Sequence, residues 1–279
     1  MISFELSEEQ RMIRDTIAAF AVDEIRPAAR PADESGDIPG ALAAKAWELG
    51  LVRGPIPEQL GGYGNQRSAV TGAIIAEELA YGDLAIALHV LAPRLLAFPV
   101  IEMGTDDQRA RILKPLSTDH FTAATAALME PRFDFDPAVL DTVAHNDGSG
   151  FILSGTKCCV PLAAEAEMLL VYAATGRDRG AAGVDAFLVP RASTGVAISA
   201  REKNMGLKGL RTYELKLDGC RVSAEARLGG GGGINFTRLL SEARVAMAAM
   251  AVGVARAAFD YARDYARERK AFGVPIATK

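Results

Sequence analysis

The chain has 279 residues, of which 49% are hydrophobic and 24% charged, and its formal net charge is −4 at pH 7. This is the composition of a globular protein large enough for two or three domains, and its mild acidity provides no basic surface for nucleic acid or an anionic membrane. The longest apolar run, Val245 to Ala255, has 11 residues, whereas a bilayer span needs roughly 20, so we expect no membrane span.

Residues 1–116 are predicted to form an N-terminal helical domain. Ser7 and Gln10 make a capping box, in which each side chain satisfies a free backbone donor at the start of a helix. Apolar residues follow at three- and four-residue spacing, and Pro27 is expected to end this segment. Further helical stretches follow, and Gly104 closes the last long one.

Residues 117–229 are predicted to form a central β-domain. Short apolar runs are separated by turn residues, and Tyr213, Leu215 and Leu217 alternate with charged residues, as in a strand with one solvated face. No helical pattern lies between these strands. We therefore expect an antiparallel sandwich or barrel, and an α+β fold for the chain as a whole.

Residues 230–279 are predicted to form the first part of a C-terminal helical bundle. The five glycines from Gly229 to Gly233 could be a phosphate-cradling loop or a flexible joint, and the joint is favoured because no GK[ST] sequence follows. A long helix is expected from Ile234, with apolar residues on several faces. Such a helix is normally buried among others, so we expect its partners in the first domain, in another subunit or in chain beyond Lys279.

Cysteine and histidine usage predicts neither a disulfide framework nor a metal site. The three cysteines are an odd number, and no CxxC pairs with a nearby histidine. Cys158 and Cys159 are most simply small hydrophobic residues rather than reactive thiols. Reduced thiols favour a cytoplasmic location.

Several short motifs, in this order, resemble those of the acyl-CoA dehydrogenase family. Each is weak alone, but together they extend over almost the whole chain. The motifs are Gly61-Gly62-Tyr63-Gly64, Ala76 to Asp83, Gly104 to Gln108, Glu130-Pro131, Gly155-Thr156-Lys157, Glu202 to Gly206 and Arg269 to Gly273.

The resemblance implies an FAD-dependent oxidoreductase of fatty acid metabolism. A base would remove the α-proton of an acyl-CoA while the β-hydrogen leaves as hydride to the flavin, and an electron-transfer flavoprotein would accept the electrons. The family usually forms tetramers, so a homotetramer or a hetero-oligomer is expected. An alternative is a non-catalytic partner subunit of a hetero-oligomeric dehydrogenase, because several expected flavin contacts are altered.

Two altered segments are expected to lie along the flavin ring. In the first, Met129 stands where the family has threonine, so a backbone contact could remain without the hydroxyl contact. In the second, Cys159, Val160 and Pro161 replace a tryptophan, an aliphatic residue and a hydroxyl residue. The resemblance therefore implies cofactor contacts from Ala126, Leu128, Met129, Cys159, Val160 and Pro161.

The resemblance also assigns roles near the C-terminus. Arg244 corresponds to an arginine near the CoA moiety, and its apolar neighbours argue against full exposure. Arg269 and Phe272 match an element that contacts FAD of a neighbouring subunit; Arg269 lies about 37 Å from Arg244 if the helix is continuous. No catalytic base can be assigned. The resemblance implies that the bundle is incomplete and that the glutamate which most members use would lie beyond Lys279; the position of a minority base is Ala243, and the adjacent Glu242 faces another side of the helix.

Overall fold

The computed structural model describes residues 5–278, so the outermost parts of the first and last predicted domains lie outside the described residues. The chain divides into two compact units. We call Met1–Pro31, Arg67–Ala87 and Glu242–Lys279 the helical unit, and Ala32–Gln66 and Leu88–Ser241 the sheet unit. Each unit thus combines segments that are distant in sequence.

The helices begin and end largely where local sequence signals place them. The capping box of Ser7 and Gln10 is confirmed, and so is the stop at Gly104. The described helices are α1 (Glu8–Phe20), α2 (Arg26–Ser35), α3 (Gly40–Glu48), α4 (Ala69–Gly82), α5 (Leu84–Leu91), α6 (Arg94–Met103), α7 (Asp106–Leu113) and α8 (Phe236–Glu268).

The predicted stop at Pro27 is wrong, because α2 continues to Ser35 and contains Pro31. A π-helical turn, Ala21–Ile25, joins α1 to α2. The change of hydrogen-bond pattern places Pro27 in the first turn of α2, where a missing N–H costs little. Pro27 therefore marks an irregular junction between two helices and not the end of a helix.

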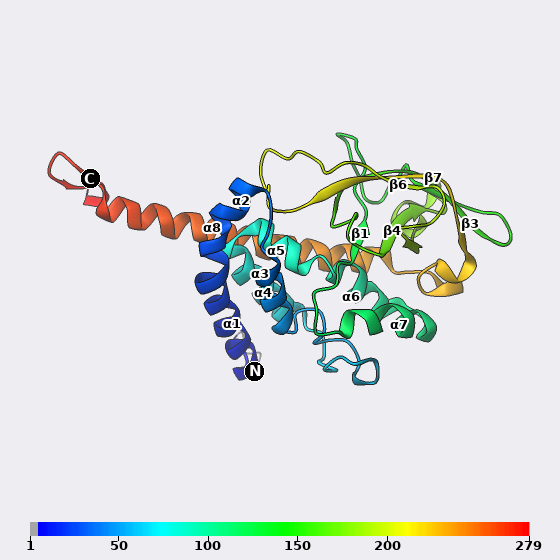
Figure 1. Ribbon diagram of the computed structural model, residues 1–279, viewed down its shortest axis with the longest axis horizontal. Helices are drawn as coiled ribbons and strands as arrows, with labels where there is room; N and C mark the ends of the chain where they lie inside the picture. The colour runs from blue at the N-terminus through cyan, green and yellow to red at the C-terminus, as the bar shows by residue number, and fades with distance from the viewer. Residues whose placement is uncertain (1–4, 279) are drawn as a thin grey trace. The chain divides into compact units, whose positions relative to one another are not determined.

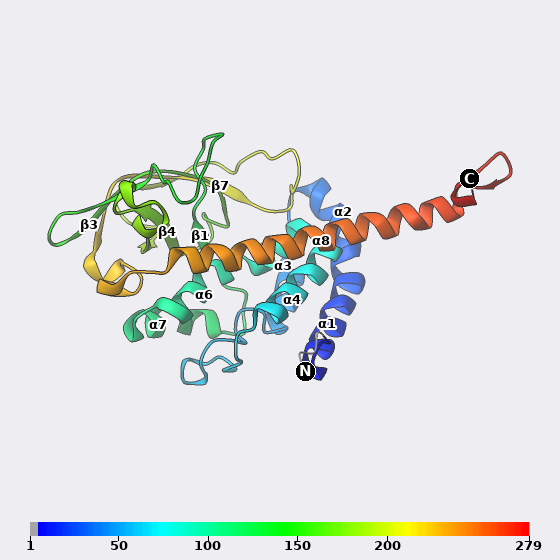
Figure 2. The same cartoon turned by 180° about the vertical axis from the view of Figure 1, so that it is seen from behind.

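Helices α1, α4 and α8 pack together within the helical unit (Figures 1 and 2). The approach of α8 to α4 is close at Gly253, where an added Cβ would lie 2.1 Å from the carbonyl oxygen of Glu77. Arg256 on α8 forms ion pairs with Glu77 and Glu78 on α4 and stacks over Tyr81. A small residue and a forked cation therefore fix the face of α8 that meets α4.

The sheet unit contains one curled mixed sheet, which Figure 1 shows beside α6 and α7. The predicted helix, sheet and helix order is confirmed, but the sheet is not purely antiparallel, because β1 and β2 both run parallel to β4. The strands are β1 (Thr125–Ala127), β2 (Val143–Asn146), β3 (Gly150–Pro161), β4 (Met168–Ala174), β5 (Val184–Pro190), β6 (Val196–Ile198) and β7 (Thr212–Ser223).

Strand β4 is buried on both faces, which explains its continuous apolar sequence. Leu170 and Tyr172 belong to a core shared with α3, α6 and α7, whereas Leu169 and Val171 belong to a second core against β3 and β7. On β7, Tyr213, Leu215 and Leu217 are buried and alternate with exposed residues, as predicted.

Helix α8 is long and apolar enough to cross a membrane by length and composition alone. Core helices of soluble proteins meet the same criterion, and α5 with α6 also meets it as a bent pair. In the described contacts, Arg256 on α8 pairs with Glu77 on α4, and Glu242 on α8 pairs with Arg67 just before α4. These contacts are those of a helix packed on another helix.

Candidate functional site

Strand β1 brings the first predicted flavin-facing segment to an edge of the sheet. Among the described residues, β1 pairs with only one strand, β4. The N–H and C=O groups on the other edge of β1 are therefore not paired with a second strand. Just past β1, the N–H of Cys158 donates to the carbonyl oxygen of Met129 at 2.9 Å. The two segments predicted to contact the ring are therefore adjacent in the structure.

A β-bulge shapes the second segment. The register of β3 against β7 shifts between Lys157 and Val160, and Cys159 adopts a left-handed conformation with φ 53°. The bulge leaves Cys159 exposed, with its N–H donating to Glu202 Oε1 at 3.1 Å. Bulges and positive φ at a non-glycine residue concentrate at functional sites, where they redirect a side chain.

A buried ion pair lies directly beneath these segments. Lys157 Nζ is 2.9 Å from Glu130 Oε1 and donates to the carbonyl oxygen of Leu128 at 3.0 Å, and both charged side chains are almost fully buried. Glu130 also accepts the N–H groups of Asp141 and Thr142, each at 2.8 Å. The pair satisfies nearly all of its hydrogen-bonding capacity, as buried charges require.

The environment of this pair shifts both pKa values downward. Burial lowers the pKa of Lys157 to about 8, although Glu130 opposes the shift. Burial tends to raise the pKa of Glu130, but the backbone donors of Asp141 and Thr142, with Lys157, outweigh it and bring that pKa to about 2. Both groups are therefore ionised at neutral pH.

The predicted cofactor residues differ in how far they are exposed to solvent. Met129 is 47% exposed, and Ala126, Leu128 and Pro161 are partly buried. Val160 is fully buried in the sheet core, where it pairs with Tyr213 of β7.

The two adjacent cysteines differ in exposure but not in the direction of their pKa shifts. The interpretation of Cys159 as a buried hydrophobic residue is wrong, because the bulge turns it outward. Burial raises the pKa of Cys158 to about 12 and raises that of Cys159 as well. Both thiols therefore stay protonated at neutral pH, which fits the expectation that they are not reactive nucleophiles.

Arg244, Arg269 and Phe272 lie on the helical unit. Arg244 is exposed, contrary to the expectation from its neighbours, because Val245 and Met247 are themselves about half exposed on faces that α4 does not cover. Arg269 directly follows α8, and Phe272 lies at the turn between β8 (Lys270–Ala271) and β9 (Val274–Pro275). Phe272 is 95% exposed with φ 55°. The continuous α8 supports the expected wide separation of Arg244 and Arg269.

The glycine run is an ordered turn in the structure. Gln108 accepts the N–H of Gly229, and its own amide donates to two carbonyl oxygens at the end of the sheet segment. The N–H groups of Gly230, Gly232 and Gly233 donate to backbone carbonyls nearby. Few donors are left to bind a phosphate, so the cradle interpretation is not supported, and the turn is held more tightly than a flexible joint.

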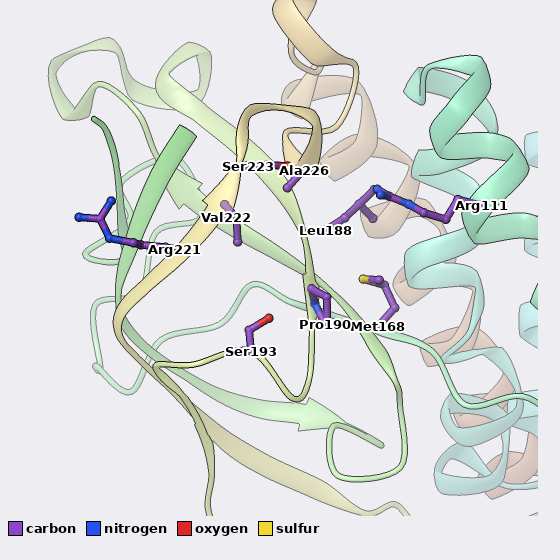
Figure 3. Close-up of a pocket in the computed structure, with 9 residues that line it drawn as sticks. All are labelled: Arg111, Met168, Leu188, Pro190, Ser193, Arg221, Val222, Ser223 and Ala226. Carbon is purple, nitrogen blue, oxygen red and sulfur yellow. The ribbon is translucent and has the colours of Figure 1, made fainter. Parts of the chain in front are cut away.

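A separate hollow of about 390 Å³ lies between α7 and the sheet (Figure 3). Arg111 reaches toward Leu188 across it, whereas Arg221 points away from it and pairs with Asp147. None of the predicted cofactor residues lines this hollow.

Family comparisons decide the identity of the fold. Three models match in succession: the N-terminal domain of acyl-CoA dehydrogenases at residues 7–120, the middle domain at 125–220 and the C-terminal domain at 230–279. The chain belongs to the acyl-CoA dehydrogenase family. The resemblance seen in the sequence motifs is thereby confirmed.

Individual acyl-CoA dehydrogenases support this assignment. The chain is 34% identical to a probable acyl-CoA dehydrogenase of Bacillus subtilis over 99% of its own length and 73% of that protein. It is 33% identical to the short-chain specific mitochondrial enzyme of Sus scrofa, over 98% of this chain and 66% of that protein. The chain thus spans between 66% and 73% of the length of these two relatives.

Solved structures connect the fold to flavin chemistry. A glutaryl-CoA dehydrogenase of Mycobacterium smegmatis in complex with FADH2 matches with a TM-score of 0.83 and 28% identity, covering 98% of this chain and 69% of that one. A chain in the structure described as the electron transferring flavoprotein of Acidaminococcus fermentans matches with a TM-score of 0.85 and 30% identity, covering 100% and 73%. These matches support FAD as the cofactor and acyl-CoA oxidation as the chemistry of the family to which this acyl-CoA dehydrogenase belongs.

Sequence reasoning missed the charged groups that contact the two predicted flavin-facing segments. Glu130 and Lys157 were noted as parts of motifs but were given no role, and Glu202 was likewise passed over. The available signal was that Lys157 is the one charged residue in the strand, because a buried cation requires an anionic partner. The anionic partner is Glu130, which lies 27 residues away in sequence, so the sequence alone does not identify it.

Proposed function

We propose that this protein introduces a double bond between the α and β carbons of an acyl-CoA thioester, with FAD bound along Ala126–Met129 and Cys159–Pro161. The observation that carries the proposal is the hydrogen bond between Cys158 and Met129, which joins the two segments beside an exposed bulge. Family membership gives the reaction class, and this juxtaposition supports the proposed place of the cofactor. The partner-subunit alternative is not favoured by the comparisons.

The residues at this place fit a flavin ring. Edge strand β1 offers backbone donors and acceptors, and the bulge leaves Cys159 outward with no bulky aromatic ring in the way. When bound, FAD accepts the hydrogen that leaves the β-carbon as hydride. Because Met129 and Pro161 have no hydroxyl groups, the backbone of these segments must supply most of the polar contacts with the ring.

Proton abstraction requires a base, and Glu242 is a poor candidate. Its carboxylate is 2.8 Å from Arg67 Nη2 within the helical unit. This carboxylate is thus already engaged by a guanidinium. Ala243, the position of one family base, has no ionisable group, so we assign the proton transfer to no described residue.

The remaining roles follow from residues exposed on the helical unit. We propose that Arg244 binds the CoA portion and that Arg269, with Phe272, binds FAD of another subunit in an oligomer. A guanidinium suits phosphate because its fork can donate to two oxygens. An electron-transfer flavoprotein is the proposed acceptor, and the three free cysteines support a cytoplasmic location.

Flavin content and acyl-CoA-dependent reduction test this proposal together. The purified protein should show a flavin absorption spectrum that bleaches when an acyl-CoA is added without oxygen, and it should reduce an artificial acceptor. Met129→Trp should diminish flavin content, whereas Phe133→Trp, on the exposed loop that follows, should not. A colourless protein that gains no flavin on incubation with FAD would refute the proposal and favour a partner subunit.

A further inference from the structure

Strand β3 holds three consecutive residues, the last two of the first predicted flavin-facing segment and Glu130 directly after it. The Leu128 carbonyl accepts from Lys157 Nζ, and the Met129 carbonyl accepts from the Cys158 N–H. The Glu130 carboxylate binds the same Lys157 ammonium. The segment leaving β1 is therefore fixed at each residue before it turns away at Pro131.

Lys157 is the shared element of this arrangement. Its ammonium is completely buried, and it donates both to a main-chain carbonyl and to a carboxylate. A pair of buried ions is rarely the most stabilising choice for such a position, since apolar residues of similar volume often stabilise as well or better. A buried charge that contacts the backbone of a ligand-binding segment instead restricts that segment to one conformation.

The restriction matters more here because side-chain contacts to the ring are reduced. Met129 and Pro161 carry no hydroxyl groups, and no aromatic ring is present at Cys159. Backbone donors and acceptors bind well only when their directions are fixed before the ligand arrives. The segment from Ala126 to Met129 therefore depends on whatever holds its carbonyls in place.

We propose that Lys157 is a positioning residue for flavin binding, which acts by holding the Leu128 carbonyl and the Glu130 side chain so that the backbone of Ala126–Met129 is preorganised. The inference rests on the proposed function for the identity of the ligand. The restraint on the segment itself is a property of the chain without cofactor. The two can therefore be tested separately.

The first measurement is hydrogen exchange of the full chain without FAD. Lys157→Met should raise exchange at the amides of Asp141 and Thr142 by about tenfold or more, because their acceptor, the Glu130 carboxylate, loses the ammonium that holds it. Exchange at the Cys158 amide should rise as well, because its acceptor is the Met129 carbonyl, which lies between the two residues that Lys157 binds. Lys216→Met changes an exposed lysine on the neighbouring strand and should leave these amides as in the wild type. Unchanged exchange in Lys157→Met would overturn the positioning role.

The second measurement is titration with FAD, followed by the visible circular dichroism of the bound flavin. Lys157→Met should weaken FAD binding by about tenfold and alter the dichroism. Leu153→Ala, which opens a cavity on the same strand, should lower stability while leaving both flavin readouts near wild type. An equal loss of FAD affinity in Leu153→Ala would show that general destabilisation, not positioning, is responsible.

A charge-free variant covers the case in which Lys157→Met does not fold. Glu130→Leu with Lys157→Met removes both ions, so no buried charge lacks a partner, and the same two measurements apply to it. A wild-type chain that takes up no FAD would refute the proposed function. The exchange comparison would still decide whether Lys157 holds the segment.

Discussion

The stability of the sheet unit should fall in acid, because Glu130 loses its stabilising contacts when its carboxylate is protonated. Replacing Glu130 by glutamine should remove most of this dependence on pH. The pKa of Glu130 is about 2 in the folded chain and 4.5 ordinarily, because hydrogen bonds to the charged form outweigh burial. A difference of about 2.5 in pKa corresponds to about 3 kcal/mol. A carboxyl group with a depressed folded pKa contributes this stability fully above pH 4.5, and the contribution is lost as the pH falls toward 2.

The variant differs from the wild type most at neutral pH. Glutamine accepts fewer hydrogen bonds from Asp141 and Thr142 and leaves the buried Lys157 ammonium without an anion, which costs roughly 3–5 kcal/mol. As the pH falls below 4.5, the wild type loses its ionic contribution and the variant does not. The gap in unfolding free energy between the two proteins should therefore narrow between pH 5 and pH 3.

Trp47 fluorescence offers a convenient assay. It is the single tryptophan of the chain, it is buried in the sheet unit, and its indole donates to the Thr118 carbonyl at 2.7 Å. Urea unfolding of the apoprotein at pH 7, 5, 4 and 3 should show the narrowing gap, whereas Glu214→Gln, an exposed change on β7, should track the wild type throughout. A constant gap between Glu130→Gln and the wild type down to pH 3 would refute the reasoning.

Three further outcomes are expected. Gly229→Ala should lower stability by at least about 1–2 kcal/mol, because φ is +75° and the new Cβ would lie 2.2 Å from the Gly233 carbonyl oxygen. In the control Gly231→Ala, the new Cβ meets nothing within 4 Å, so this variant should be nearly neutral. Equal melting temperatures of the two variants would contradict this reasoning. Arg269→Ala should reduce FAD retention during dialysis of the oligomer by about tenfold or more, and full retention would remove the assigned role. Met129→Thr with Pro161→Thr should tighten FAD roughly tenfold to thirtyfold in a titration, and weaker binding would mean that these residues do not face the ring.

Local signals in the sequence predicted the elements whose determinants lie within a few residues of each other. The Ser7 capping box and the alternation from Tyr213 to Leu217 depend on nearest neighbours, and both are present in the structure. The continuation past Pro27 was missed because it depends on a π-helical turn that no residue type marks. The parallel pairing of β1 and β2 with β4 was missed because it joins segments far apart in sequence.

The site was predicted as two segments, and the structure adds what joins them. Motif resemblance proposes Met129 and Cys159, because those positions are defined by their neighbours in the chain, and their contacts with flavin stay a prediction. It could not show that Val160 points into the core, since the bulge that sets its orientation is visible only in the pairing of β3 with β7. Nor could it connect Lys157 with Glu130, which depends on the turn after β1.

The bulge on β3 also adds one residue that the pleat itself does not need. Lys157 and Val160 both point inward although they are three residues apart, which regular alternation would forbid. Deleting either Cys158 or Cys159 would leave them two residues apart, and both would still face inward in a regular pleat. The extra residue therefore builds the outward turn at Cys159 without changing the side on which later residues lie, and a single-residue deletion should abolish that turn while Val160 keeps its core position.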